Sequence, residues 1–195
     1  MKRIGLVITA AGNSARFGGD KLGCSIDGVP MLERCLRLYA QEPLGARFCV
    51  RVVVLQSFRT EAAQLAQTLG YTVVYNDLPE EGMARSVRLG TEMMQKEQVD
   101  GAMYSVADQP YLKAETPQRL LDAFERAPDR IVAPCAEGHR GNPVVFPQDL
   151  LPLLAELEGD VGGSRVIRRN LERLQTVAVP REELTDIDTK AEVKK

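Results

Sequence analysis

Two cationic residues lie in a glycine-rich segment near the start of the chain. The segment TAAGNSARFGGDKL (residues 9–22) contains Arg16 and Lys21 and directly follows the short apolar run MKRIGLVI. Glycine lets backbone N–H groups approach an anion closely. An arginine adds a planar fork of donors, and a lysine adds a compact charge. The pattern favours a cradle for phosphate groups; a tight surface turn with incidental charges is the alternative.

The spacing of this segment differs from that of two familiar phosphate-binding loops. A Walker A loop needs GxxxxGK followed by Ser or Thr, whereas Leu22 follows Lys21 and the glycines at 12 and 19 do not have that spacing. The dinucleotide fingerprint GxGxxG is also absent from the strand-to-helix turn. If the segment binds phosphate, it therefore does so in another way.

The elements that would position this loop follow an α/β pattern. Apolar runs of strand length alternate with segments of helical periodicity, which is typical of a sheet with helices on both faces. We expect strands at 3–9, 50–55, 72–75, 102–107, 131–134, 143–146 and 176–179, and helices at 30–41, 60–69, 82–96, 116–126, 150–157 and 163–171. No linker or repeat interrupts the pattern, so we expect one domain with a mostly parallel sheet. Ligands bind outside the carboxyl ends of such strands, which places the opening loop, the segment after Tyr75, and Asp108 at one edge.

Composition limits the classes of partner. The chain has 195 residues and a formal net charge of -2, so no global field favours nucleic acid or a membrane surface. No apolar run approaches the length of a bilayer crossing, and the N-terminal apolar run is too short for a signal peptide. The four cysteines have no CxxC spacing and no neighbouring histidine, which argues against zinc. We therefore expect a reduced, cytoplasmic protein that binds neither nucleic acid nor a membrane.

The opening loop closely resembles that of nucleotidyltransferases, which move NMP from an NTP onto a phosphate and release pyrophosphate. The shared pattern AAGxSxRFGxxK is carried by Ala10, Ala11, Gly12, Ser14, Arg16, Phe17, Gly18 and Lys21. Further segments match in the expected order: NDLPEEGMARSVRLG (76–90), VADQP (106–110), GHRGNPVVF (138–146), GDVGGSR (159–165) and TDIDT (185–189). Together they resemble the molybdenum-cofactor cytidylyltransferases of the MobA-like NTP transferase superfamily.

Two sequence differences indicate which base is used. The guanylyltransferase branch typically carries Gly-Gly where this chain has Ala10-Ala11, and Asn where it has Asp186 and Asp188. The resemblance therefore implies CTP. The chain also departs from the family pattern, because Lys-Ala-Glu (190–192) follows Asp-Thr where Pro and an acidic pair are usual, and Thr9 stands where Leu is commoner.

The resemblance implies a role for each matching residue. The expected nucleotide-binding residues are Ala10, Ala11, Gly12, Asn13, Ser14, Arg16, Lys21, Asn76, Gly82, Met83 and Ser86, and Arg16, Lys21 and Asp108 are the expected catalytic residues. The expected acceptor-binding residues are His139, Arg140, Gly141, Asn142, Pro143, Gly159 and Asp160. Mg²⁺ would be held by Asp108 and Asp188, with Asp186 as the competing ligand. Structural alternatives remain open: Asp108 could serve a turn, the aspartates at 186 and 188 could cap a helix, residues 138–143 could be mere connection, and the Gly159-Asp160 pair could cap the helix after it.

These residues imply a Rossmann-like nucleotidyltransferase domain over 1–195, with an NTP-binding part at 1–110 and an acceptor-binding part at 111–195. It would transfer CMP from CTP to the phosphate of a molybdopterin-type cofactor, with Mg²⁺, and release pyrophosphate. Because the attacking phosphate is already anionic, catalysis needs positioning and charge stabilisation rather than a strong base, which suits a chain with one histidine. The alternatives are a guanylyltransferase, a sugar- or polyol-phosphate cytidylyltransferase, and a chaperone that delivers the cofactor. A client molybdoenzyme is an expected partner, since a labile product has to be handed on.

Overall fold

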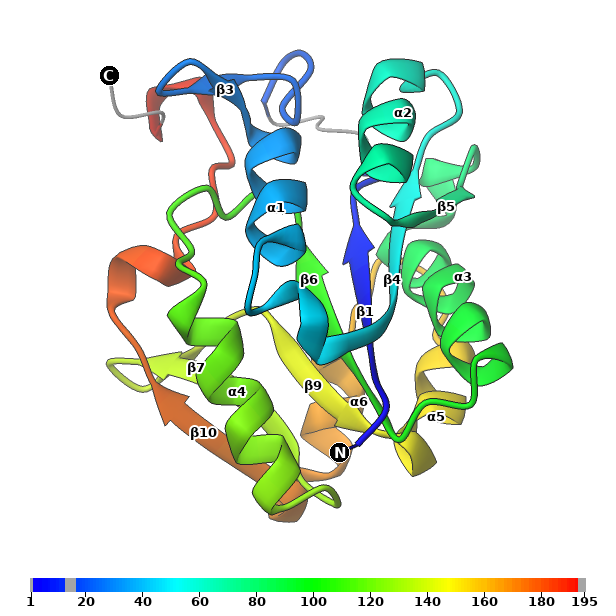
Figure 1. Ribbon diagram of the computed structural model, residues 1–195, viewed down its shortest axis with the longest axis vertical. Helices are drawn as coiled ribbons and strands as arrows, with labels where there is room; N and C mark the ends of the chain where they lie inside the picture. Colours follow the sequence, from blue (N-terminus) through cyan, green and yellow to red (C-terminus); the bar gives the residue numbers. More distant parts are fainter. Residues whose placement is uncertain (1, 13–16, 193–195) are drawn as a thin grey trace.

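A mixed sheet forms the centre of the protein (Figure 1). The computed structural model describes residues 2–12 and 17–192. The strand order is β10-β7-β9-β6-β1-β4-β5, with β8 paired to β7. The strands are β1 (Ile4–Thr9), β4 (Phe48–Leu55), β5 (Thr72–Tyr75), β6 (Gly101–Val106), β7 (Ile131–Ala136), β8 (His139–Arg140), β9 (Val144–Pro147) and β10 (Leu174–Ala178). A separate hairpin, β2 (Ser25–Ile26) with β3 (Val29–Pro30), lies between β1 and the first helix.

Strand β1 occupies the middle of the sheet because nearly all of its side chains are apolar. Five of its six residues are buried, as expected for a strand covered on both faces. It runs parallel to β4 and β6, and Thr9 at its end is in register with Val54 and Val106. The carboxyl ends of three strands therefore meet at one edge.

Helices cover both faces of the sheet. One apolar core contains side chains of α1 (Met31–Ala40), α2 (Thr60–Thr68) and α4 (Glu115–Arg126), and Figure 1 shows α1 and α4 in front of the sheet. A second core contains those of α3 (Met83–Lys96), α5 (Leu151–Ala155) and α6 (Ser164–Arg169). Within residues 2–12 and 17–192, no helix combines the length and apolarity that crossing a bilayer requires.

The expected fold class is confirmed: this is a Rossmann-like α/β domain with a mostly parallel sheet. Strand β9 is antiparallel to both β6 and β7, and β8 is antiparallel to β7. The helix expected at 150–157 is shorter, because a 3₁₀ turn at Gln148–Leu150 precedes α5. The four cysteines are all free thiols.

The order of the strands creates a switch point beside β1. The chain passes from β1 to β4 and β5 on one side, then crosses to β6 on the other side of β1. Connections leaving β1 and β6 therefore diverge at the carboxyl edge, which is where ligands bind in open α/β sheets.

Candidate active site

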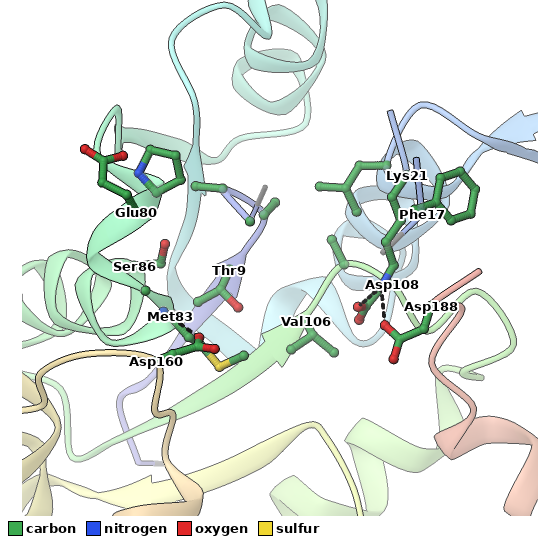
Figure 2. A pocket seen from close by; sticks show the side chains of 17 residues that line it. Thr9, Phe17, Lys21, Glu80, Met83, Ser86, Val106, Asp108, Asp160 and Asp188 are labelled. Atoms are coloured by element: carbon green, nitrogen blue, oxygen red, sulfur yellow. Dashed lines mark hydrogen bonds and ion pairs between the residues drawn. The ribbon is translucent and has the colours of Figure 1, made fainter. Parts of the chain in front are cut away.

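A cavity of about 470 Å³ opens at this switch point. Its walls come from the loop after β1, the end of β6, the start of α3 and the C-terminal segment, and they include Gly12, Lys21, Ser86, Asp108, Asp160 and Asp188. Figure 2 shows Lys21, Asp108 and Asp188 together on one side of the cavity. Ser86, Met83 and Asp160 lie on the opposite side. The cavity thus has a charged wall and a second wall that presents the start of a helix.

The charged wall is a lysine held between two carboxylates. Lys21 Nζ donates to Asp108 Oδ2 at 2.6 Å and to Asp188 Oδ1 at 3.1 Å. Burial alone would lower the pKa of Lys21, but the hydrogen bonds and charges of the two aspartates outweigh burial and raise that pKa above its ordinary value. The ammonium group is therefore a fixed positive charge at neutral pH.

Asp188 reaches this wall because the preceding residue is anchored twice. The Ile187 backbone N–H donates to the carbonyl oxygen of Asp108 at 3.0 Å. Its side chain is fully buried in a small apolar cluster with Phe17, Ile26 and Met31. That cluster joins the loop after β1 to a segment about 170 residues further along the chain. The two carboxylates are therefore neighbours through backbone pairing and packing.

The turn that carries Asp188 is also closed from its C-terminal side. Glu192 Oε2 accepts the backbone N–H of Asp188 at 2.7 Å and that of Thr189 at 2.8 Å. These bonds lower the pKa of Glu192. The Lys-Ala-Glu ending that departs from the family pattern thus supplies an acidic residue that orders the Asp188 turn.

The lysine loop is held from its other side by a residue that the sequence analysis missed. Arg59 binds Asp20 in a bidentate manner, with Nη2–Oδ1 at 2.6 Å and Nη1–Oδ2 at 3.2 Å. Asp20 Oδ1 also accepts the Gly23 N–H at 3.1 Å. The Arg59 hydrogen bond holds the pKa of Asp20 below its usual value. Since Asp20 is adjacent to Lys21, this pair stabilises the loop at the lysine; only the position of Asp20 beside a candidate lysine could have suggested it.

The two carboxylates fit a magnesium ion that substrate phosphates would help to hold. Asp108 Oδ1 is buried and has no hydrogen-bond partner within the described part of the chain, which leaves a strong acceptor for a cation. Mg²⁺ usually takes one or two carboxylates plus phosphates and water. Among residues 2–12 and 17–192, no group of three or more His, Cys, Asp or Glu side chains is placed to hold a metal. Asp108 and Asp188 therefore suit a metal that arrives with phosphates.

Asp186, the competing ligand, does not line the cavity. Partial desolvation of its carboxyl group and the nearby charge of Asp108 raise the pKa of Asp186 to about 6, although the residue as a whole is exposed. Its side chain hydrogen-bonds to Gln109. This placement favours Asp188 over Asp186 as the second ligand.

The expected nucleotide-binding residues divide into three groups. Those lining the cavity are Ala10, Ala11, Gly12, Lys21, Gly82, Met83 and Ser86. Asn76 is buried behind Ser86 and does not line it. Asn13, Ser14 and Arg16 lie outside the described residues.

The helix start in the opposite wall is held by the Gly159-Asp160 pair. Gly159 O accepts the Ala84 N–H at 3.1 Å, and Asp160 Oδ1 accepts the Met83 N–H at 3.4 Å. Gly82 has φ of 83°, and a Cβ there would lie 2.5 Å from the Gly159 oxygen. Only glycine permits this approach. The loop thus caps the start of α3 within this wall, and Asp160 also lines the cavity.

The remaining acceptor candidates do not line this cavity. Strand β8 carries two of them, both exposed, and His139 Nδ1 lies 3.1 Å from the carbonyl oxygen of Glu137. Because β7 is antiparallel to β9, which is antiparallel to β6, the end of β7 and strand β8 face the same edge as Asp108. The candidates that do not line the cavity are His139, Arg140, Gly141, Asn142, Pro143 and Gly159. Their contact with an acceptor stays a prediction.

Fold and site define an α/β protein with a glycine-containing loop, a lysine and two carboxylates at its switch point. A family model described as the MobA-like NTP transferase domain matches residues 6–176, and the chain belongs to this family of nucleotidyltransferases. The resemblance seen in the sequence is thereby confirmed at the family level. No curated protein matches the sequence.

Solved structures share the fold. Rv0371c from Mycobacterium tuberculosis H37Rv is similar, with a TM-score of 0.79, 23% identity, and coverage of 97% of this chain and 95% of that chain; it has also been solved in complex with manganese. A 4-diphosphocytidyl-2C-methyl-D-erythritol synthase from Anaerococcus prevotii has a TM-score of 0.78 at 14% identity, covering 98% and 93%. A CMP:2-keto-3-deoxy-manno-octonic acid synthetase complexed with CTP has a TM-score of 0.71 at 17% identity, covering 97% and 94%.

Proposed function

We propose that the protein is a Mg²⁺-dependent cytidylyltransferase that converts a molybdopterin-type cofactor to its cytosine dinucleotide. The observation that carries the proposal is the Lys21–Asp108–Asp188 group beside the glycine-rich loop at the switch point. A site for binding alone has little need of two carboxylates around a buried ammonium. The Ala10-Ala11 pair and the two aspartates at 186 and 188 support CTP, as do the cytidylyl names of two structural neighbours.

The reaction requires little covalent chemistry from the protein. An oxygen of the acceptor phosphate attacks the α-phosphorus of CTP, a new P–O bond forms, and the bond to the β-phosphate oxygen breaks with release of pyrophosphate. Lys21 stabilises the negative charge that spreads over the phosphates, and Arg16 is proposed to do the same from the loop. Asp108 and Asp188 would hold Mg²⁺, which supplies charge neutralisation when bound. The base would lie against Ala10-Ala11 and the start of α3, which both line the cavity. Figure 2 shows Met83 and Ser86 of this helix start across the cavity from the charged wall.

Asp108→Asn tests the carboxylate role. We expect transfer to fall by about 100-fold or more, since a neutral amide is a poor Mg²⁺ ligand, while the variant remains folded because the amide oxygen can still accept from Lys21 Nζ. Asp27→Asn is a matched control, because Asp27 is exposed on the β2–β3 turn. Substantial turnover by a folded Asp108→Asn variant would refute the role.

Nucleotide preference is measured by thermal unfolding with CTP, GTP, ATP and UTP, each with and without Mg²⁺. A ligand at about 100 times its Kd adds roughly 2.7 kcal/mol of stability. A Mg²⁺-dependent shift that is largest for CTP is the expected result. A largest shift with GTP would instead favour a guanylyltransferase.

Two other candidates differ in the acceptor or in the absence of turnover. A sugar- or polyol-phosphate cytidylyltransferase is supported by the names of the same two neighbours, and it would release pyrophosphate with such a phosphate but not with a molybdopterin. A delivery chaperone would bind the cofactor and release no pyrophosphate. If the proposed product forms, we expect a client molybdoenzyme to receive it directly.

A further inference from the structure

Asn76 is buried behind the wall of the cavity that carries Ser86, and its orientation is fixed by its partners. It follows β5, is 1% exposed, and its Oδ1 accepts the Leu78 backbone N–H at 3.1 Å and Arg85 Nε at 3.0 Å. Neither group can accept a hydrogen bond, so the atom facing them must be the amide oxygen. The amide nitrogen therefore faces the other way.

The amide nitrogen of Asn76 donates to Ser86 Oγ at 2.9 Å. The Ser86 hydroxyl has thus accepted one hydrogen bond and retains its own proton. A serine in a helix often donates to the carbonyl four residues earlier, as Thr91 on the same helix does to Val87 at 2.7 Å. Within residues 2–12 and 17–192, no hydrogen bond donated by the Ser86 hydroxyl is formed. Because Ser86 lines the cavity, its proton is available to a ligand there.

We propose that Asn76 determines base specificity without touching the nucleotide, by making the Ser86 hydroxyl a hydrogen-bond donor toward the base. This inference rests on the proposed function, in which the base lies on this wall. Asn76 is a positioning residue. Its hydrogen bonds with Arg85 and Leu78 fix the orientation of its amide group, and the amide group then fixes the direction in which the Ser86 hydroxyl donates.

A fixed donor discriminates between base edges. Cytosine presents two acceptors, O2 and N3, on its Watson–Crick edge. Guanine presents N1–H and an amino group on that edge and only O6 as an acceptor, so a donor placed for O2 or N3 of cytosine would meet a guanine donor. Specificity then arises as much from rejecting guanine as from binding cytosine.

N76D tests the direction of the bond with almost no change in size. The carboxylate still accepts from Leu78 and Arg85, but it can only accept from Ser86 as well. The Ser86 proton then turns away from the cavity, and the oxygen lone pairs face the base. We expect the Kd for CTP with Mg²⁺, measured by titration calorimetry, to rise about tenfold or more, the value of one lost hydrogen bond. The ratio of GTP affinity to CTP affinity should rise with it.

S86A provides the matched control. It removes the hydroxyl, so it should weaken CTP binding, and N76D added to S86A should produce no further change in base preference. Independent, additive effects of the two substitutions would overturn the inference.

The outcomes separate this inference from the proposed function. Wild-type protein that binds no nucleotide would overturn both. Wild-type protein that prefers CTP, together with folded N76D of unchanged preference, would overturn the inference alone. If N76D does not fold, 3-deaza-CTP and 2-thio-CTP replace it, since each weakens one cytosine acceptor. The wild type should then bind one of the two analogues about tenfold more weakly than CTP, whereas S86A should bind that analogue and CTP equally. Equal wild-type affinity for CTP and both analogues would overturn the inference.

Discussion

Lys21→Met removes the positive charge between Asp108 and Asp188 while keeping a side chain of similar length. In the wild type the ammonium group is 2.6 Å and 3.1 Å from the two carboxylates. Without it, two negative charges face each other at the edge of the cavity. We expect Lys21→Met to be less stable than the wild type, and to gain more stability from Mg²⁺ or Mn²⁺.

The magnitude follows from the burial of the group. Breaking a fully buried pair by removing one partner costs about 3–5 kcal/mol, whereas exposed pairs are worth about 1 kcal/mol or less. The Lys21 side chain is 10% exposed, and those of Asp108 and Asp188 are 25% and 37% exposed. We therefore expect a loss of about 1–3 kcal/mol. Each kcal/mol lowers the melting temperature by about 2–4 °C in a domain of this size.

The metal response should be stronger in the variant than in the wild type. In the wild type a divalent ion competes with the ammonium group for the carboxylates, whereas in Lys21→Met it relieves their repulsion. Ligand-linked stabilisation should therefore begin at a lower metal concentration in the variant. Calorimetric melting across a metal titration measures both effects, and Lys113→Met, an exposed lysine in the loop after β6, is the control. Equal melting temperatures and equal metal responses would refute the reasoning.

The pH dependence gives a further check. The folded-state pKa of Lys21 is raised above its ordinary value of 10.5. The stability from this lysine is therefore fully present below that ordinary value and is lost only as the pH rises through the raised pKa. The difference between wild type and Lys21→Met should stay constant across neutral pH and shrink only under strongly alkaline conditions. A difference that varies steeply near neutrality would contradict this assignment.

Three further substitutions test the parts that hold the site. Ile187→Ala truncates a fully buried side chain and should lower the free energy of unfolding by about 2–4 kcal/mol, measured by chemical unfolding. A loss below about 1 kcal/mol would show that neighbouring side chains move in to fill the space. Arg59→Gln should lower the melting temperature at neutral pH and much less in acid, because the lowered pKa of Asp20 gives stability that is lost as the pH falls through that pKa; a difference that persists below it would contradict this. Gly82→Ala should destabilise by about 1–3 kcal/mol or more, since its Cβ would meet the Gly159 oxygen; an unchanged unfolding midpoint would show that the two loops separate freely.

The sheet and helices were predictable because each depends on local pattern. The continuous apolar run ending at Thr9 predicted a central strand, and the observed β1 is buried along five of its six residues. Strand β8 and the β2–β3 hairpin were missed, because each strand has only two residues and shows no periodicity over that length. Local pattern also could not show that β9 is antiparallel, since direction depends on how the chain returns to the sheet.

The site was predictable in its residue types and unpredictable in its contacts. The motif indicated Lys21, Asp108 and Asp188, and all three line one cavity. The nucleotide-binding residues expected from the family resemblance also included Asn76, which in the fold lies behind the cavity wall and donates a hydrogen bond to Ser86. A motif records which residues occur together and cannot separate a ligand-contacting side chain from one that orients it.

The contact between the loop that carries Lys21 and the C-terminal segment shows why a structure is needed to separate ligand-contacting residues from those that position them. Ile187 is one apolar residue between two aspartates, and in the sequence it indicates no more than a short buried segment. In the fold its N–H pairs with Asp108 and its side chain packs with Phe17, so the same residue sets the distance between the two carboxylates. Loss of this packing would move Asp188 away from Lys21 and leave Asp108 in place at the end of β6. The spacing of the proposed magnesium ligands therefore depends on a hydrophobic contact. Loss of that contact should lower the rate of transfer more than it lowers the affinity for the nucleotide, whose base is proposed to bind the opposite wall.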